Sequence, residues 1–247
     1  MSKKTIIFSI VLIIVATFLG SEMFLDEELT QGVVVSEQAH IAEMATESAE
    51  VETQMQEWII SSYDEMMRRI SKEEGQDWLL MSAIAYSESR FHSDVVSKKG
   101  AIGLMQIMPI VGKQFNVEKE HIVDPETNIR LAGKLLKQID KTLKLSPDIS
   151  ANDRLSIILA CYNGGIGHVS DARRLAKSNG EDHNSWEVVA RYLKMKADPA
   201  IYESELVRYG KFTGSRQTEA YVREVMKRYD FYCNLVENGA DMVAQVK

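Results

Sequence analysis

Apolar residues recur every three or four positions from about residue 51 onward, which is the spacing of amphipathic α-helices. This pattern predicts a first helix from about Val51, ended by Gly75, and a second from an Asp77 N-cap through Glu88. The first helix would bury Met55, Trp58, Ile59, Met66 and Ile70. Further helices are predicted over 124–143, 151–162, 186–195 and 217–237. Because alternating strand patterns are nearly absent, we expect a mainly α-helical fold with little or no sheet.

The N-terminus follows a different pattern. Lys3 and Lys4 precede seventeen uncharged and mostly apolar residues, 5–21. A membrane-spanning helix needs ~20 apolar residues, with a range that reaches down to about 17. Residues 1–21 are therefore predicted to be either a cleaved signal peptide or an N-terminal membrane anchor that is retained. In both cases the rest of the chain would be exported to the periplasm or cell envelope.

Charge is distributed unevenly along the chain. Residues 5–67 hold 12 acidic residues and no Lys or Arg, whereas residues 68–247 hold 24 acidic residues and 27 Lys or Arg. We interpret residues 22–50 as an acidic tether and residues 51–247 as one globular domain. The mild positive balance of residues 68–247 suits an anionic polymer, but no basic run is dense enough to indicate nucleic acid.

Two cysteines and five histidines give little sign of covalent or metal chemistry. Cys161 and Cys233 could form a disulfide in an exported protein or remain two free thiols, and the sequence leaves both readings open. The histidines lack the spacing of metal ligands, and no phosphate-binding glycine loop is present. We therefore expect no metal and no cofactor.

The stretch ESRFHSDVVSKKGAIGLMQIMP, residues 88–109, begins with an acid on a helix end. Met81, Ile84 and Ala85 precede Glu88 at spacings that place all four on one stripe of the helix. Burial there would raise the pKa of the carboxyl and make it a general acid near neutral pH. The alternative is that Glu88 turns into solvent or pairs with Arg90. The other acid nearby, Asp94, is interpreted as a solvated loop residue.

Four segments carry a resemblance to a known family. They are ESRF, SKKGAIGLMQIMP, CYNGG and QTEAYVREV, in this order between about residues 75 and 235. They resemble the four motifs of the soluble lytic transglycosylase (SLT) family, whose catalytic domain is lysozyme-like, an α+β class that here would have little or no sheet. This sequence has Cys161 and Gly164 where the family usually has Ala, and Gln217 where it usually has Glu, so an acid role at position 217 is in doubt.

The resemblance implies a reaction and a substrate. Family members cleave the β-1,4 bond between N-acetylmuramic acid and N-acetylglucosamine in peptidoglycan without water, and the muramic C6 hydroxyl closes a 1,6-anhydro ring. Glu88 would act first as acid and then as base, which accounts for the missing second carboxylate of ordinary glycosidases. Glycan strands would be the partner, and protein partners stay open. A hydrolytic muramidase and a non-catalytic peptidoglycan-binding or scaffold domain remain as alternatives.

The same resemblance implies a set of substrate-binding residues. They are Ser97, Gln106, Met108, Tyr162, Asn163 and Tyr221. Four have a structural alternative, namely a turn for Ser97, core packing for Met108 and Tyr221, and helix capping for Asn163. Gln106 stands in an apolar stretch, where a sugar could satisfy its amide. Tyr162 would stack on a sugar face and direct its hydroxyl toward Glu88.

Overall fold

The computed structural model describes residues 59–245, with side chains through residue 238. The predicted leader, residues 1–21, and the predicted tether, residues 22–50, lie outside the described residues. Across the described range, none of the helices combines the length and the apolar character needed to cross a bilayer.

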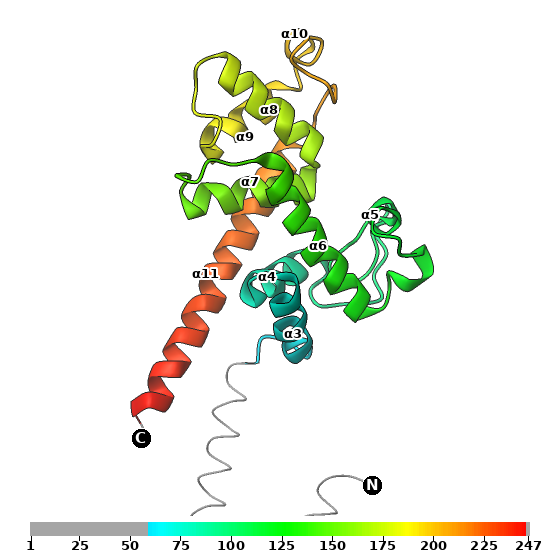
Figure 1. Cartoon of the computed structure of the whole chain (residues 1–247), viewed down its shortest axis with the longest axis vertical. Coiled ribbons are helices and arrows are strands. Elements are labelled where there is room, and N and C mark those ends of the chain that lie inside the picture. Colours follow the sequence, from blue (N-terminus) through cyan, green and yellow to red (C-terminus); the bar gives the residue numbers. More distant parts are fainter. Residues whose placement is uncertain (1–58, 246–247) are drawn as a thin grey trace, which may run out of the picture. The chain divides into compact units, whose positions relative to one another are not determined.

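Helices make up most of the described chain (Figure 1), which confirms the predicted fold class. In chain order they are α3 (Asp64–Glu74), α4 (Trp78–Ser89), α5 (Pro109–Gln114), η1 (Lys119–His121, a 3-10 turn), α6 (Pro125–Leu143), α7 (Ala151–Gly164), α8 (Ile166–Ser178), α9 (Trp186–Met195), α10 (Pro199–Tyr202) and α11 (Ser215–Gln245). Between residues 59 and 245 there is no strand. Two isolated antiparallel bridges join Val96 to Ile102 and Ile102 to Ile107.

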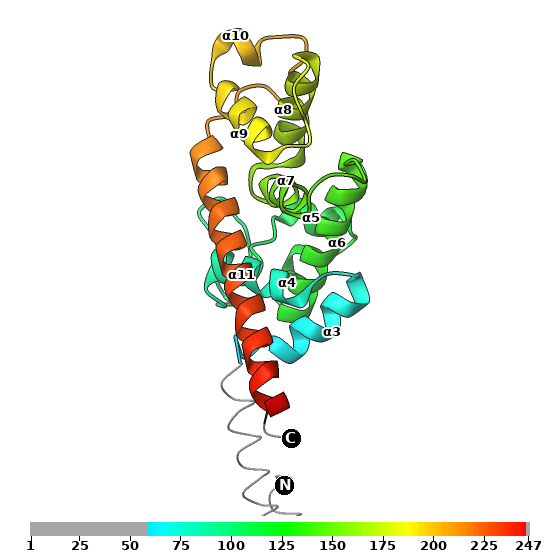
Figure 2. The same ribbon diagram turned by 90° about the vertical axis from the view of Figure 1, so that its left-hand side faces the viewer.

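The longest helix, α11, organises the domain. It packs against α4, α7 and α9, and both views show it running beside the shorter helices (Figures 1 and 2). Around it, α3 packs on α6 and α8 packs on α9. Side chains of α11 can therefore reach residues of α4 and α7 that are far away in sequence.

Helix α4 is the buried centre of this arrangement. Its residues 79–85 are all buried, so the helix is enclosed on every side. The Asp77 carboxylate caps it by accepting from the N–H of Leu79 at 2.7 Å, as predicted. The predicted Asp124 cap of α6 is confirmed too, since its carboxylate accepts from the N–H of Thr127 at 2.9 Å. Because α4 is fixed from its first turn, the residue at its far end is fixed as well.

The first predicted helix is wrong over residues 59–63, and its predicted start from Val51, with Met55 and Trp58, lies outside the described residues. Residues 59–63 are not helical, α3 begins only at Asp64, and Ile59 is 57% exposed instead of buried. The Asp64 carboxylate accepts from the N–H groups of Ile60 and Ser61, at 2.8 and 3.0 Å. Such side-chain bonds to nearby backbone stabilise a turn in place of a helix. The sequence analysis also missed the six-residue α5 and the longer α8.

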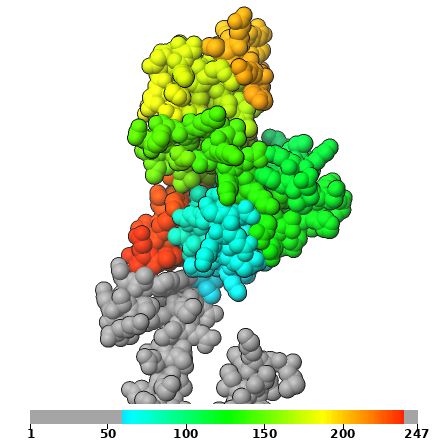
Figure 3. Space-filling view, viewed as in Figure 1, coloured from blue at the N-terminus to red at the C-terminus, as the bar shows by residue number. Residues whose placement is uncertain are grey.

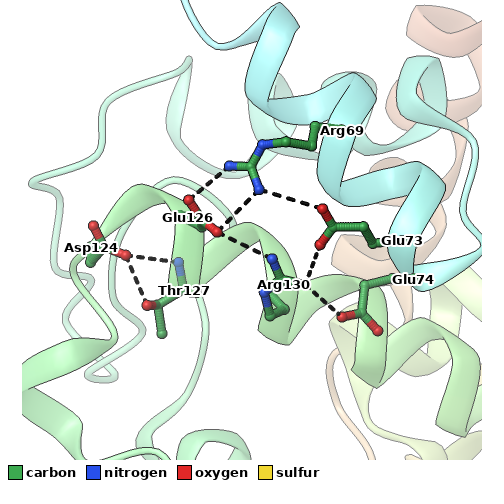
Figure 4. A network of polar contacts seen from close by, with 7 residues as sticks. All are labelled: Arg69, Glu73, Glu74, Asp124, Glu126, Thr127 and Arg130. Atoms are coloured by element: carbon green, nitrogen blue, oxygen red, sulfur yellow. Dashed lines mark hydrogen bonds and ion pairs between the residues drawn. The ribbon is translucent and has the colours of Figure 1, made fainter.

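An ion-pair network fixes α3 against α6 (Figure 4). The Arg130 guanidinium lies 2.7 Å from the Glu73 carboxylate, 3.2 Å from that of Glu74 and 3.1 Å from that of Glu126. Arg69 pairs with Glu126 at 2.7 Å. These arginines lower the pKa of both Glu73 and Glu126. The network attaches the start of the described domain to its centre.

Both cysteines are free. Cys161 is buried in α7 and Cys233 is partly buried in α11. Of the two readings that the sequence left open, the free thiols are the correct one.

Candidate active site

Glu88 lies in the last turn of α4, on the same stripe of that helix as three fully buried residues. Met81, Ile84 and Ala85 are each 0% exposed. Burial raises the pKa of the Glu88 carboxyl to about 7, and the nearby Tyr221 hydroxyl partly opposes that rise. The side chain is therefore close to half protonated at neutral pH. The alternative pairing with Arg90 is wrong, because the Arg90 guanidinium faces Glu224 at 3.9 Å.

Two tyrosines from other helices surround this carboxyl. Burial raises the pKa of Tyr221 on α11 well above 10, and the charges of Glu88 and Tyr162 add to the rise. Within the described residues, the Tyr221 hydroxyl makes no hydrogen bond of ordinary geometry, although it is close enough to lower the pKa of Glu88. It is a buried donor that faces the carboxyl.

Tyr162 is oriented differently from the prediction. Its hydroxyl donates to the backbone carbonyl of Met105 at 2.7 Å, so its hydrogen is not directed at Glu88. Burial raises the pKa of Tyr162, and the negative charge of Glu88 raises it further, so the two side chains are still neighbours. Tyr162 therefore connects α7 to the loop between α4 and α5, residues 90–108, which faces Glu88.

The residue after Glu88 joins α4 to the same loop. The buried Ser89 hydroxyl lies 2.7 Å from the carbonyl of Leu104 and 3.1 Å from that of Ala85. Its single hydrogen can bridge both acceptors. The sequence alone did not predict this role of Ser89, because a hydroxyl near a helix end does not reveal a partner fifteen residues later.

Asn128 on α6 is the second anchor that the sequence analysis missed. Its amide oxygen accepts from the N–H of Met105 at 2.7 Å, and its amide nitrogen donates to the carbonyls of Ile102 and Ile122 at 2.9 and 2.7 Å. Gly103 lies against it with φ +78°, and a Cβ there would come within 2.6 Å of the Asn128 amide nitrogen. A glycine is required at that position.

Ser97 and Gln106 mainly hold the loop together. The Ser97 hydroxyl accepts from the N–H of Ala101 at 3.0 Å, which is a contact that stabilises the turn. Gln106 has φ +50°, and its amide nitrogen donates to the carbonyls of Val95 and Gly103 at 3.1 and 2.9 Å. The expectation that a sugar must satisfy this amide group is therefore wrong for its N–H donors. Among the described residues nothing donates to its oxygen, which stays available to a ligand.

Met108 is exposed, and Asn163 joins two helices. Met108, directly before α5, is 38% exposed, so the core reading is wrong. Asn163 does not cap α7. Its amide oxygen accepts from the Thr218 hydroxyl at 3.0 Å and so joins α7 to α11. Thr218 and Tyr221 both lie on α11, so the position of this helix determines this bond and the position of the Tyr221 hydroxyl.

Other features of the described residues lie elsewhere. A hollow of about 570 Å³ between α7, α9 and α11 is lined by residues that include Trp186 and Arg223 and none of the predicted site residues. In the part of the chain that the structure describes, no group of three His, Cys, Asp or Glu side chains is arranged to hold a metal ion.

Comparison with known proteins supports the same region. Residues 65–185 match the family model described as the Transglycosylase SLT domain. The membrane-bound lytic murein transglycosylase F of Stutzerimonas stutzeri (strain A1501) is 34% identical over 168 residues, which are 68% of this chain and 33% of that protein. The protein of the same name from Alcanivorax borkumensis is 33% identical over 169 residues, 68% of this chain and 34% of that protein. This chain thus spans about a third of the length of the curated relatives it matches.

The fold has a relative among solved structures. An inactive mutant of the lytic transglycosylase Slt from Pseudomonas aeruginosa superimposes with a TM-score of 0.50 at 24% identity, over 71% of this chain and 24% of that one. The likeness shows a common fold. The matched domain, residues 65–185, contains Glu88 and every predicted site residue except Tyr221. Through this domain the chain belongs to the SLT-type lytic transglycosylase family.

Proposed function

We propose that this protein is a peptidoglycan lytic transglycosylase. It would cleave the β-1,4 bond between N-acetylmuramic acid and N-acetylglucosamine without water and leave 1,6-anhydromuramic ends, as part of cell-wall remodelling or turnover. The observation that carries the proposal is the lone Glu88 carboxyl, whose burial holds its pKa at about 7.

In the first step Glu88 acts as an acid. With a pKa of about 7, the carboxyl carries a proton in a large share of molecules at neutral pH. It donates that proton to the glycosidic oxygen as the bond from this oxygen to muramic C1 breaks. General acid catalysis of this kind contributes about 10²–10⁴-fold to a rate.

In the second step the same group acts as a base. The Glu88 carboxylate takes the proton of the muramic C6 hydroxyl while O6 bonds to C1 and closes the anhydro ring. Glu88 ends protonated, as it began, and no water is consumed. The Tyr221 hydroxyl, which lowers the pKa of Glu88, would donate to the carboxylate and stabilise it between the two steps.

The surroundings of Glu88 support a one-carboxylate mechanism. A retaining glycosidase places its two carboxyl groups only about 5–5.5 Å apart. At that distance the second charge would shift the pKa of the first. Within residues 59–245, only burial and the Tyr221 hydroxyl perturb the pKa of Glu88, and the acid nearest in sequence, Asp94, is exposed.

Location is part of the same proposal. The apolar residues 5–21 would export the domain and either be removed or remain as an anchor in the membrane. The curated relatives are named membrane-bound murein enzymes, which supports a place in the periplasm or cell envelope. Anchoring would keep the domain close to its glycan substrate.

Product analysis tests the proposed reaction. Purified protein is incubated with peptidoglycan, and the fragments are analysed by mass spectrometry. We expect anhydro ends, each lighter by one water than a reducing end. Glu88→Gln should lower turnover by at least ~100-fold. Asp94→Asn, which removes an exposed carboxylate in the following loop, should retain activity. Reducing ends would favour a muramidase, and absence of any cleavage would refute the enzymatic role.

A further inference from the structure

Tyr209 is an aromatic side chain that is exposed on one side only. It lies in the segment between α10 and α11 and is 60% exposed. Its ring lies against Gly167 in the first turn of α8, where an added Cβ would come within 2.4–2.5 Å of three ring atoms. No side chain larger than hydrogen fits between ring and helix. One face of the ring is thus supported by backbone, while the other is open.

The backbone of Tyr209 is fixed by a buried carboxylate. The N–H groups of Tyr209 and Arg208 donate to the two oxygens of Asp171, at 2.9 and 3.0 Å. Asp171 is paired with Lys196 at 2.7 Å, and both side chains are 0% exposed. Because removing two charges from water is costly, a buried ion pair is an unusual way to hold a short surface segment in place.

The segment is also fixed at its other end. The N–H of Phe212 donates to the carbonyl of Lys196 at 3.1 Å, and the ring centroid of Phe212 lies 4.6 Å from that of His168. The His168 ring meets Tyr209 edge to face, with centroids 6.4 Å apart. Residues 208–212 are therefore held rigidly against α8, unlike an ordinary surface loop.

This segment lies near the candidate active site. Helix α8 starts directly after the turn that ends α7, and Gly167 is five residues from Tyr162. Five residues span at most about 18 Å, so Tyr209 contacts a helix turn within that reach of Tyr162. The space-filling view shows a recess between the lobe that carries α10 and the lobe that carries α5, with the segment after α10 on the border facing it (Figure 3).

We propose that the open face of Tyr209 stacks on a sugar of the glycan strand, one that lies along the strand from the bond cleaved at Glu88. The proposal rests on the proposed function for the identity of the strand. The negative face of an aromatic ring attracts the C–H groups on one face of a pyranose. A ring that is already fixed loses little conformational entropy on binding, which favours a platform over a mobile side chain. Tyr209 then determines how well the strand is held, and Glu88 determines how fast it is cut.

Kinetics of matched variants test the role of Tyr209. Tyr209→Ala should raise KM for long glycan strands about tenfold, equivalent to about 1.4 kcal/mol, and leave kcat within about twofold. Tyr209→Trp should restore most of the affinity, because it keeps an aromatic face. The control is Phe231→Ala, an equally exposed ring at 55%, which lies ten residues or about 15 Å along α11 from Tyr221. Thermal unfolding checks that each variant is folded.

Two kinetic results would overturn the proposal. One is a KM for Tyr209→Ala that equals that of the wild type. The other is an equal rise in KM for Phe231→Ala, which would indicate a general effect of removing surface aromatics.

A binding measurement separates this proposal from the proposed function. Glu88→Gln and the double variant Glu88→Gln/Tyr209→Ala are sedimented with insoluble peptidoglycan, and the free fractions are compared. Weaker binding of the double variant supports the Tyr209 platform even if the wild type yields no anhydro ends. Equal binding of the two refutes the platform even if anhydro ends are found.

Discussion

Replacing Glu88 by Gln should stabilise the protein at alkaline pH. Burial raises the pKa of Glu88 from its ordinary 4.5 to about 7, so the folded state binds this proton more tightly than the unfolded chain does. As the pH rises from about 4.5 to 7, the unfolded chain ionises first and the folded state loses relative stability. Above pH 7 the loss reaches about 3 kcal/mol. Gln does not titrate, so the Glu88→Gln variant does not lose this stability.

The measurable quantity is the difference in unfolding free energy between variant and wild type at two pH values. Between pH 4.5 and pH 8 it should move in favour of Glu88→Gln by about 2–3 kcal/mol. Urea denaturation followed by far-UV circular dichroism gives both values. Any packing cost of the amide is common to both conditions and cancels, as does the titration of other groups.

Asp94→Asn serves as the control, because it removes an exposed carboxylate from the neighbouring loop. Its difference from the wild type should not change between the two pH values. A Glu88→Gln difference that is equally flat would refute the reasoning, since it would mean that Glu88 ionises alike in the folded and unfolded chain. A shift in the opposite direction would place the folded pKa below 4.5.

Three further outcomes follow from the same structure. If protonated Glu88 is the acid, kcat/KM of the wild type should fall about tenfold between pH 6 and pH 8. The measurement is the rate of formation of soluble glycan fragments at each pH, and a kcat/KM that does not change with pH would contradict this. Asn128→Ala removes three buried hydrogen bonds, so urea denaturation should show a loss of about 3 kcal/mol, and a loss below about 1 kcal/mol would count against the anchor. Lys196→Met leaves the buried Asp171 without its amine partner and should cost about 3–5 kcal/mol, whereas Lys196→Met with Asp171→Asn should cost less than the two single losses combined.

Long periodic helices were predictable because the spacing of apolar residues within each segment shows which face is buried. The prediction for 186–195 matches α9, and the caps at Asp77 and Asp124 are present as predicted. Helix α8 carried a similar signal in Val169, Ala172 and Leu175, all buried, and was missed behind its glycines. Helix α5 has only six residues, too few to establish a period.

The site was predictable only where its chemistry is local. The raised pKa of Glu88 follows from a stripe of residues on its own helix, which can be read from spacing. The bond from the Tyr162 hydroxyl to the Met105 carbonyl joins residues 57 positions apart, and Asn128 reaches the loop across 23 positions. Such partners depend on which helices pack together, and the spacing of apolar residues along the sequence does not show this.

Three non-glycine residues with positive φ lie at the end of α4 and in the loop that follows it. Arg90, Phe91 and Gln106 have φ values of 55°, 63° and 50°, a region that costs a non-glycine residue about 1–2 kcal/mol. Glycine would relieve the strain but would lose each side chain's contact. The Arg90 guanidinium lies 4.2 Å from the centre of the Tyr86 ring, Phe91 meets that ring edge to face, and the Gln106 amide bonds two loop carbonyls. Glycine would also make the unfolded chain more flexible, which offsets part of the relief. The side chains of these strained residues therefore hold the end of α4 and the facing loop in place, and with them the position of Glu88.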